Sequence, residues 1–501
     1  MPTTISIGIV GGGVSGTMFL HQIVELNKKE KIPFTLKIDL FDQGRSGLGG
    51  RSSHRNVKEE EREYDFDHGC QFFRADTLTM RNIISKFIES GNIIEEWKAN
   101  FDFSEQLKHC DFFGMPGNGP FYVGVGGMHN FPRAIVNAAE KMIKQDTNKN
   151  IDINIYPQTR VSKLVHRNNK NDNSSNSNKN NNRKNLKKNL WELVGTNGNA
   201  AFHDTKESIA QLAKHKNLND KETNSDGVYD FIILTDISST SFDSWHRASA
   251  GVPDSFSKAV RDRVGARVPL FSAMVAFETS LPLTSDTITF PIDENGDGGD
   301  CWFAAKTNSK PGFEHLKAEC WTIVSTPIYA ANQIKLVPMQ DVKTGEFIPQ
   351  EPGYLKNVPA KQLVSSFLKA MNISDSATPN ILHLNAQRWG SALPAPNHHV
   401  VGNNFSSRWI LSGVNYDVGK SKLYPTTINE DIKEGSSFYY DDKLSLMQIG
   451  DMISNYTPGM ESGVLSAVEG ATFLMEMLKS SSSSSSSSLK KGNKNLVNGR
   501  M

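Results

Sequence analysis

Cysteine is scarce in this chain, and its charges nearly cancel. The 501 residues include four cysteines, Cys70, Cys110, Cys301 and Cys320, and none of them stands in a C-x-x-C pair or at a metal-ligand spacing. We therefore expect reduced thiols, no disulfide framework and no metal site. With 55 basic and 54 acidic residues, the chain lacks a net charge that would attract nucleic acid or an anionic membrane surface.

Long apolar runs are absent as well. No stretch reaches the ~18 apolar residues of a membrane-spanning helix. The first residues read as a β-strand and not as a basic segment followed by an apolar one, so we expect no export and a cytoplasmic location. A chain of this length can form two or more domains.

The chain does contain, close to its start, an apolar strand that runs into three spaced glycines. Residues 5–16 read ISIGIVGGGVSG, and Gly11, Gly13 and Gly16 fit the G-x-G-x-x-G pattern that joins a parallel strand to a helix in dinucleotide-binding folds. Gly11 allows a tight turn, Gly13 lets the backbone approach a pyrophosphate, and Gly16 lets helix and strand pack closely. A helix over roughly 14–27 would point its positive N-terminal end at the phosphates.

An acidic residue follows the second predicted strand. Residues 35–42 read TLKIDLFD, and Asp42 lies 26 residues after Gly16, somewhat beyond the usual ~20. The polar loop at 28–31 accounts for the excess. A carboxylate at this place accepts both hydroxyls of an adenosine ribose and repels a 2′-phosphate. The alternative is that Asp42 merely ends the strand, and the upstream glycines favour the ribose role.

A second pair of glycines distinguishes between two dinucleotides. Gly49 and Gly50 precede Arg51 in GLGGRS, and residues 67–73 read DHGCQFF. An NAD dehydrogenase needs no second glycine pair after its ribose acid. The longer FAD needs another close backbone approach and a cation, here Arg51 or Arg45. The alternative is an ordinary surface turn.

A matching strand, acid and helix lie near the other end of the chain. Residues 448–451 read QIGD, and residues 459–478 read GMESGVLSAVEGATFLMEML. We expect Asp451 to face the ribityl hydroxyls of FAD and the helix to begin beneath the flavin ring. Its N-terminus would stabilise negative charge on the N1/O2 edge of the reduced flavin. No cysteine lies near this stretch, so we expect the FAD to be bound non-covalently.

Together these motifs resemble the FAD-dependent amine-oxidase superfamily, and within it most the renalase-type branch of NAD(P)/FAD-dependent oxidoreductases. That branch carries a D-H-G-A-Q-Y-F-like stretch, a V-G-x-P-G-M-like stretch and a closing G-D…V-E-G-A-x-L-S-G. The stretches that carry the resemblance are 67–73, 123–128 (VGVGGM), 310–312 (KPG), 321–328 (WTIVSTPI), 388–394 (RWGSALP), 450–451 and 460–466.

The resemblance implies an α/β fold. We expect a Rossmann-like FAD-binding domain of the glutathione-reductase/amine-oxidase type, with an inserted α+β substrate domain built on a mixed sheet that roofs the flavin. The ligand would then lie between the domains. The boundaries that we expect are 1–75, 122–246 and 405–479 for the FAD-binding domain, 76–121 and 247–404 for the substrate domain, and 480–501 for a disordered tail.

The resemblance also implies which residues contact the cofactor and the substrate. The expected FAD contacts are Gly11, Gly13, Val14, Ser15, Gly16, Asp42, Gln43, Gly49, Gly50, Arg51, His68, Gly69, Gln71, Val161, Gly450, Asp451, Met460, Glu461 and Ser462. For His68 the alternative is a buried residue that only satisfies its hydrogen bonds. Trp389, Trp321 and Phe73 are the aromatic candidates for the substrate cavity, and the alternative for each is a plain core position.

An Asn/Lys/Ser tract interrupts the middle of the chain. Residues 168–189 lack the apolar content that would offset the entropy of ordering them, so we expect a disordered loop there. The tract lies between two strand-like runs, 159–166 and 190–194, and we interpret it as an enlarged hairpin loop. Residues 229–235 (YDFIILT) then read as the buried fourth strand of the nucleotide sheet.

Three functions remain open. The renalase-type function would transfer a hydride from a dihydro-nicotinamide isomer to FAD, and O2 would reoxidise the flavin and release H2O2. An amine oxidase would act on a primary or secondary amine, and Lys306 could then lie near flavin N5, although a surface position is the alternative. A non-catalytic relative would use the fold for binding or escort.

Since a flavin performs hydride transfer itself, the lack of a nucleophile–base triad does not argue against an enzyme. We expect a small-molecule substrate, O2 as electron acceptor, and neither a nucleic acid nor a membrane as partner.

Overall fold

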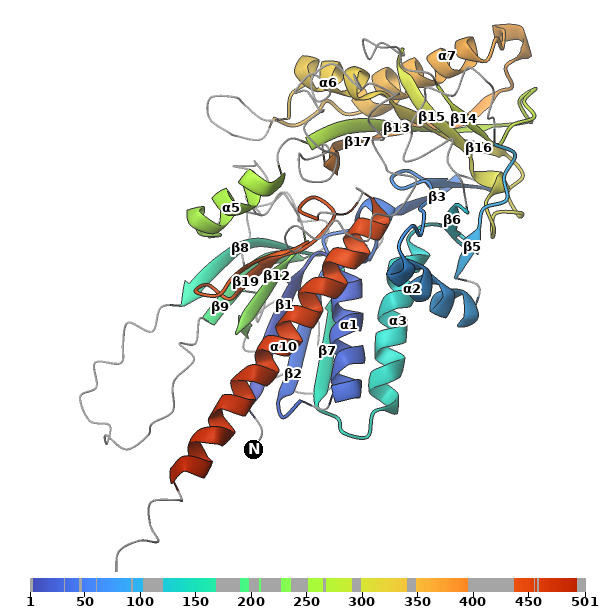
Figure 1. Cartoon of the computed structure of the whole chain (residues 1–501). Helices are drawn as coiled ribbons and strands as arrows, with labels where there is room; N and C mark the ends of the chain where they lie inside the picture. The colour runs from blue at the N-terminus through green and yellow to red at the C-terminus, as the bar shows by residue number, and fades with distance from the viewer. Residues whose placement is uncertain are drawn as a thin grey trace, which may run out of the picture.

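The computed structural model has two main sheets, and Figure 1 shows helices packed against each of them. The structure describes residues 3–30, 32–44, 47–59, 61–91, 93–101, 120–167, 190–197, 207–208, 227–235, 251–264, 267–290, 299–339, 348–394, 437–454, 456 and 459–492.

A six-stranded sheet forms around the N-terminal strand. Its order is β18-β19-β12-β1-β2-β7, and every pairing except that of β18 with β19 is parallel. Strands of a parallel sheet covered on both faces are continuously apolar, as Ile7, Ile9 and Leu40 illustrate, since all three are wholly buried. The strands are β1 (Thr4–Val10), β2 (Thr35–Phe41), β7 (Ile151–Tyr156), β12 (Phe231–Leu234), β18 (Tyr439–Asp441) and β19 (Leu446–Gln448).

Three long helices cover one face of this sheet. In Figure 1, α1 (Val14–Glu30) packs between α3 (Asn130–Gln145) and α10 (Met460–Gly492). The predicted helix over 14–27 is confirmed and continues three residues further. α10 was predicted to end near residue 478, with a disordered tail beyond it. It instead continues through the serine run, because a helix already formed by its buried first half extends at little cost per residue.

A small antiparallel sheet covers the other face. It contains β8 (Thr159–Arg167), β9 (Leu190–Asn197), β10 (Glu207–Ser208) and β11 (Val228–Tyr229), and its core joins that of β1 and β12. β8 and β9 pair from Thr159 opposite Asn197 to Arg167 opposite Leu190, which confirms the predicted hairpin. Residues 168–189, predicted to be its loop, lie outside the described residues. The predicted strand over 229–235 is divided, because Tyr229 pairs with β9 and β12 begins at Phe231.

The second main sheet has five strands in the order β14-β15-β16-β13-β17. Its pairings are antiparallel throughout, which corrects one detail, the mixed sheet, of an otherwise confirmed fold class. Helices α6 (Pro327–Leu336) and α7 (Lys361–Ala370) pack on its outer face. The strands are β13 (Arg267–Phe277), β14 (Thr287–Thr289), β15 (Cys301–Lys306), β16 (Glu319–Ser325) and β17 (Ile381–Pro394).

A hairpin of β3 (His54–Glu59) and β4 (Arg62–Asp67) links the two sheets. Tyr64 and Phe66 of β4 are buried against Met274 and Cys320 on the inner face of the five-stranded sheet. The short helix η1 (Gly50–Ser52) precedes the hairpin. The other described elements are α2 (Leu78–Glu89), β5 (Ile94–Glu96), β6 (Tyr122–Gly124), α5 (Asp254–Val264), η5 (Thr307–Ser309), the π-helix η6 (Lys356–Ala360) and η7 (Asp375–Ala377).

Residues 80–97 read MRNIISKFIESGNIIEEW, a helix-like pattern, and α2 covers only its first part. α2 ends at Glu89, and Gly91 follows with a φ of 140°, a conformation that other residues rarely adopt and that stops the helix. The apolar residues beyond it form β5, which pairs with β6.

Among the residues that the structure describes, no helix combines the length and the hydropathy needed to cross a membrane.

The same described residues contain no group of three or more His, Cys, Asp or Glu side chains that could hold a metal ion. Cys70, Cys301 and Cys320 are free thiols, and Cys110 lies outside the described residues.

Candidate dinucleotide site

The glycine-rich turn between β1 and α1 has the geometry that its sequence predicts. The Gly11 amide donates to the carbonyl of Phe41 at 2.8 Å, and its φ of 109° favours glycine. A Cβ on Gly16 would overlap the carbonyl oxygen of Gly11, so glycine is required for packing there. A Cβ on Gly13 would meet no protein atom closer than 3.8 Å. Gly13 is therefore not needed for packing within the protein, and its lack of a side chain leaves a cradle that a Cβ would fill.

The second glycine pair lies directly beside the first. Gly13 and Gly49 form a parallel bridge, and the Gly49 amide donates to the carbonyl of Gly12 at 3.1 Å. Gly50 follows with a φ of 56° and its Cα near Gly13. The two glycine motifs, separated by the whole of α1 and β2, thus form one backbone surface.

Asp42 lies at the end of β2, next to this surface. Its carboxylate accepts hydrogen bonds from the amides of Gly12 at 2.8 Å and Gly44 at 2.7 Å. These two bonds fix the carboxylate at the end of β2, beside the glycine turns. Gln43, also expected to contact the cofactor, is exposed.

The structure pairs a cation with an acid that were each expected to face the cofactor. Arg51 donates from Nη1 to Oδ2 of Asp451 at 2.8 Å and from Nη2 to Oδ1, and Nη1 also donates to the carbonyl of Ala392 at 2.9 Å. A two-bond fork of this kind fixes both side chains. Arg45, the alternative cation, lies outside the described residues.

The turn at 67–71 lies between η1 and β17. The indole Nε1 of Trp389 donates to the carbonyl of His68 at 2.7 Å, and the two rings stack with centroids 5.5 Å apart. The Cys70 amide donates to the carbonyl of Arg51 at 2.8 Å, and a Cβ on Gly69 would overlap that same carbonyl oxygen. The five-stranded sheet therefore covers the segment that was expected to contact the flavin.

His68 is neutral in this environment. Burial, followed by the nearby charge of Arg55, lowers the pKa of its imidazole to about 3. Its Nε2 lies 3.4 Å from the hydroxyl of Ser53, and its buried Nδ1 has no hydrogen-bond partner among the described residues.

Asp67 begins the turn at the centre of a buried charged cluster. Its Oδ1 accepts from the Met128 amide at 2.9 Å and from Nδ1 of His54 at 3.0 Å, and its Oδ2 accepts from Nζ of Lys310 at 3.0 Å. Burial raises the pKa of the Asp67 carboxyl, but Lys310 and then His54 outweigh burial and hold that pKa far below its usual value. The stretches 67–73, 123–128 and 310–312, which carried the family resemblance, thus meet at one carboxylate.

The N-termini of α1 and α10 lie close together. A Cβ on Gly463 would lie 2.8 Å from the hydroxyl of Ser15. The Gly450 amide, at a φ of 122°, donates to the hydroxyl of Ser466 at 2.9 Å. Ser462, in the first turn of α10, is wholly buried, and its hydroxyl has no partner among the described residues. Two helix ends with positive partial charge therefore point into one region, and Val14 and Met460 begin the two helices.

The carboxylate of Glu461, a residue expected to contact the cofactor, binds backbone amides ahead of α2. Its carboxylate accepts from the amides of Asp76 at 2.9 Å and Thr77 at 2.7 Å, ahead of α2. Thr77 in turn accepts from Met80 as the N-cap of that helix. Both carboxylate oxygens of Glu461 thus accept hydrogen bonds from backbone amides that precede α2, where a helix leaves its first amides without partners.

Trp321 does not line a cavity beneath the five-stranded sheet, which corrects the prediction. It packs on the outer face against Phe367 of α7, with ring centroids 5.3 Å apart, and donates from Nε1 to Glu319 at 2.8 Å. The alternation of side chains along β16 places it on that face.

Phe73 and Val161 also pack within the protein. Phe73 stacks on Phe131 of α3, with ring centroids 5.5 Å apart. It therefore occupies a core position, the alternative to a place in the substrate cavity. Val161 is buried with Val10 and Phe41 beneath the small sheet.

The two lysines near the end of β15 differ in their surroundings. Nζ of Lys306 lies 2.6 Å from Asp286 in a partly exposed ion pair. Lys310 is buried against Asp67. The sequence did not indicate this role, because lysine side chains are rarely buried and a surface position is the usual expectation for them. The signal that could have found it is the K-P-G motif, which was noted only for its resemblance.

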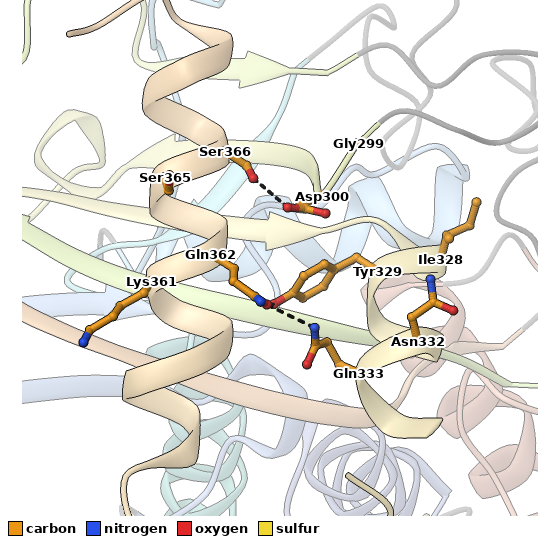
Figure 2. Close-up of a pocket in the computed structure, with 10 residues that line it drawn as sticks. All are labelled: Gly299, Asp300, Ile328, Tyr329, Asn332, Gln333, Lys361, Gln362, Ser365 and Ser366. Atoms are coloured by element: carbon orange, nitrogen blue, oxygen red, sulfur yellow. Dashed lines mark hydrogen bonds between the residues drawn. The ribbon is translucent and has the colours of Figure 1, made fainter. Parts of the chain in front are cut away.

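A cavity of about 580 Å³ opens between α6 and α7, on the outer face of the five-stranded sheet (Figure 2). Its polar side chains bond to one another. The Tyr329 hydroxyl donates to Gln362 at 2.7 Å, the Gln333 amide donates to the same oxygen at 3.0 Å, and the Ser366 hydroxyl donates to Asp300 at 2.6 Å. None of the predicted site residues lines it.

Comparisons with known proteins agree with the N-terminal geometry. Residues 9–87 match the family model of the NAD(P)-binding Rossmann-like domain. This part of the chain is a Rossmann-like unit of the kind that binds a nucleotide cofactor. No curated protein matches the chain.

Solved structures offer weak likenesses. A candidate protoporphyrinogen oxidase from Exiguobacterium sp. 255-15 is 10% identical, with 94% of this chain and 98% of that chain covered and a TM-score of 0.43. A flavoprotein/dehydrogenase from Cytophaga hutchinsonii is 10% identical, with 95% and 79% covered and a TM-score of 0.38. The p-nitrophenol 4-monooxygenase PnpA from Pseudomonas putida DLL-E4 is 9% identical, with 77% and 68% covered and a TM-score of 0.31. At such TM-scores, nothing about activity or substrate follows from the likeness.

Proposed function

We propose that the chain is a renalase-like, FAD-dependent oxidoreductase. It would accept a hydride from a dihydro-nicotinamide isomer and pass the electrons to O2 to give H2O2. The observation that carries this proposal is the cradle at Gly13, bordered by the second glycine pair. A pyrophosphate can approach the backbone at Gly13, and the surface continues along Gly49 and Gly50 as the longer FAD requires.

The residues around the cradle fit such a cofactor. Asp42 would accept the ribose hydroxyls, and the Arg51–Asp451 pair would present a cation to the pyrophosphate and an acid to the ribityl chain. The N-terminus of α10, with the unpartnered hydroxyl of Ser462, would face the flavin ring. When bound, FAD supplies the hydride acceptor itself. The protein would bind it, orient it and exclude water, and Trp389 would cover the turn at 67–71.

The expected domain boundaries are part of this proposal. The six-stranded sheet draws strands from all three segments assigned to the FAD-binding domain, namely β1 and β2, β7 and β12, and β19. We also propose non-covalent FAD and a cytoplasmic location, and the free thiols Cys70, Cys301 and Cys320 support both.

The positions of the two lysines favour a dihydro-nicotinamide over an amine. A dihydropyridine is a strong hydride donor that needs only stacking and orientation. An amine must also be deprotonated near the flavin. Lys306, the lysine considered for that place, is bound to Asp286, and Lys310 is bound to Asp67.

Anaerobic mixing of the purified, yellow protein with 2- or 6-dihydro-nicotinamide isomers tests the proposal. The flavin should bleach within seconds with these isomers and not with spermine, benzylamine or simple monoamines. Air should then restore the oxidised spectrum with about one peroxide per flavin, as two-electron turnover requires. Bleaching by amines alone would instead indicate the amine oxidase. A flavin that neither class reduces would indicate a non-catalytic flavoprotein or escort module.

A further inference from the structure

We infer that Lys310 is a positioning residue, which holds the turn at 67–71 in the shape that the cofactor site needs without itself contacting cofactor or substrate. The inference deepens the proposed function and rests on it.

Lys310 forms hydrogen bonds with the side chains of the first and last residues of the turn, Asp67 and Gln71. Its Nζ donates to Oδ2 of Asp67 at 3.0 Å and to Oε1 of Gln71 at 3.4 Å. The side-chain nitrogen of Gln71, Nε2, donates in turn to the backbone carbonyls of Asp67 and Gly69. The side chains of Lys310, Asp67 and Gln71 therefore close the turn from one side.

The other oxygen of Asp67 is held separately. The Met128 amide and the His54 ring bind Oδ1, so they fix the position of the carboxylate. Neither of these two bonds involves Gln71. Among the described residues, Lys310 is the cation that joins the carboxylate of Asp67 to the side chain of Gln71.

The ammonium group cannot reach a ligand from this position. Lys310 is 2% exposed and Asp67 is 1% exposed, and Nζ lies 5.2 Å from the ring centroid of Trp97. Replacing a buried ion pair by apolar residues of similar volume is often neutral or stabilising. Stability alone therefore does not explain a lysine here, whereas a need for fixed geometry does.

The turn that Lys310 closes carries the contacts of the proposed site. The His68 carbonyl binds Trp389, and the Cys70 amide binds the carbonyl of Arg51, next to Gly49 and Gly50. Lys310 itself lies beyond η5, and Pro311 accepts from the Gly126 amide at 2.9 Å. Lys310 thus couples the five-stranded sheet to the region where the flavin would bind.

The test compares Lys310→Met with Lys306→Met in the full-length chain. The dissociation constant for FAD is measured by quenching of flavin fluorescence on titration into the apoprotein, and the thermal midpoint of the apoprotein is measured in parallel. We expect Lys310→Met to weaken FAD binding by about tenfold or more, the size of a lost hydrogen bond to a charged group. Lys306→Met, which removes a partly exposed ion pair in the same region, should bind FAD as the wild type does.

A double variant separates positioning from charge balance. Lys310→Met leaves the Asp67 carboxylate less compensated, which lowers the midpoint, and Asp67→Asn in the same chain removes that charge. We expect the double variant to recover the midpoint but not the affinity for FAD, because Gln71 still lacks its ammonium partner. Recovery of both would show that Lys310 only balances charge and would overturn the inference.

A further variant decides the matter if Lys310→Met does not fold. Gln71→Met keeps the ion pair but removes the contact between Lys310 and Gln71, and it should also weaken FAD binding. An unchanged dissociation constant for FAD in Gln71→Met or in Lys310→Met would overturn the inference about Lys310 and leave the proposed function standing. A wild-type chain that binds no FAD would overturn the proposed function and, with it, the inference.

Discussion

The guanidinium of Arg51 binds both carboxylate oxygens of Asp451, which lies 400 residues further along the chain. Arg51 also donates to the carbonyl of Ala392 on β17. One side chain thus joins the glycine turn after β2, the end of β19 and the five-stranded sheet. The interactions that define the candidate site therefore also hold distant parts of the fold together.

Arg51→Met should destabilise the protein. Asp451 is 4% exposed in its side chain, so loss of its partner leaves a buried, unpaired carboxylate. The Arg51 side chain is 38% exposed, and solvent reduces the effect, which we expect to be about 2 kcal/mol in the free energy of unfolding. Asp451→Asn in the same chain should recover most of that loss. Urea unfolding of the two single variants and the double variant measures the coupling, and strictly additive effects would contradict the pairing.

Gly13 and Gly16 should respond differently to substitution. Gly13→Val should abolish FAD binding, because the branched side chain fills the cradle. The free energy of unfolding of the apoprotein should stay within about 1 kcal/mol of the wild-type value. Gly16→Ala should destabilise the apoprotein by about 1–3 kcal/mol, because its Cβ overlaps the backbone. Flavin absorbance after gel filtration and urea unfolding measure the two effects. Full FAD occupancy in Gly13→Val would refute the cradle.

Features that depend on short-range pattern could be predicted from the sequence. The turn at Gly11, the helix that follows and the position of Asp42 after β2 each depend on residues within one βαβ unit. The β8–β9 hairpin was recognisable because two strand-like runs flank a polar tract.

Features that depend on tertiary contacts could not be predicted. Burial of Lys310 requires Asp67, which lies 243 residues earlier, and nothing local to Lys310 signals it. The first turn of α10 predicts that Glu461 lies near a helix N-terminus, but not that its carboxylate turns toward α2. Alternation along β16 fixes the face of Trp321 only relative to its neighbours, and the position of α7 decides which face is outer.

The tract at 168–189 should be dispensable. Since Arg167 and Leu190 pair directly, an Asn-Gly turn can replace the 22 residues between them. A shorter loop costs less closure entropy, so stability should be unchanged or higher by no more than about 2 kcal/mol. Thermal unfolding and FAD titration of the shortened chain measure this. Insoluble protein would show that the tract contributes to the fold.

The apoprotein should lose stability in alkaline solution as His54 loses its proton. His54 is buried between two carboxylates, with Nε2 2.7 Å from Asp65 and Nδ1 3.0 Å from Asp67. Burial lowers the pKa of His54, but Asp65 and then Asp67 outweigh it and raise that pKa to about 9. The ring stacks between His129 and Phe313, and Lys310 binds the far side of Asp67.

The sign of the pH dependence follows from this raised pKa. In the unfolded chain His54 has its usual pKa of 6.5, so between about pH 6.5 and 9 the folded state binds one more proton. The stabilisation is complete below pH 6.5 and is lost as the pH rises through 9, at up to about 1.4 kcal/mol per pH unit. The neutral rings of His68 and His129, whose pKa values burial lowers to about 3 and 4, act in the opposite sense and only below pH 6.5.

Urea unfolding of the apoprotein at pH 6, 7.5 and 9 measures this slope. His54→Gln should be less stable than the wild type at pH 6, because Asp65 and Asp67 lose their shared cation. Its stability should change little between pH 6.5 and 9, because the group that titrates there is gone. His315→Gln is the matched control, since His315 is about half exposed and lies 3.5 Å from the same Asp65. It should retain the wild-type slope. An equal slope in His54→Gln would show that another group titrates in this range and that His54 is not the cation between the two carboxylates.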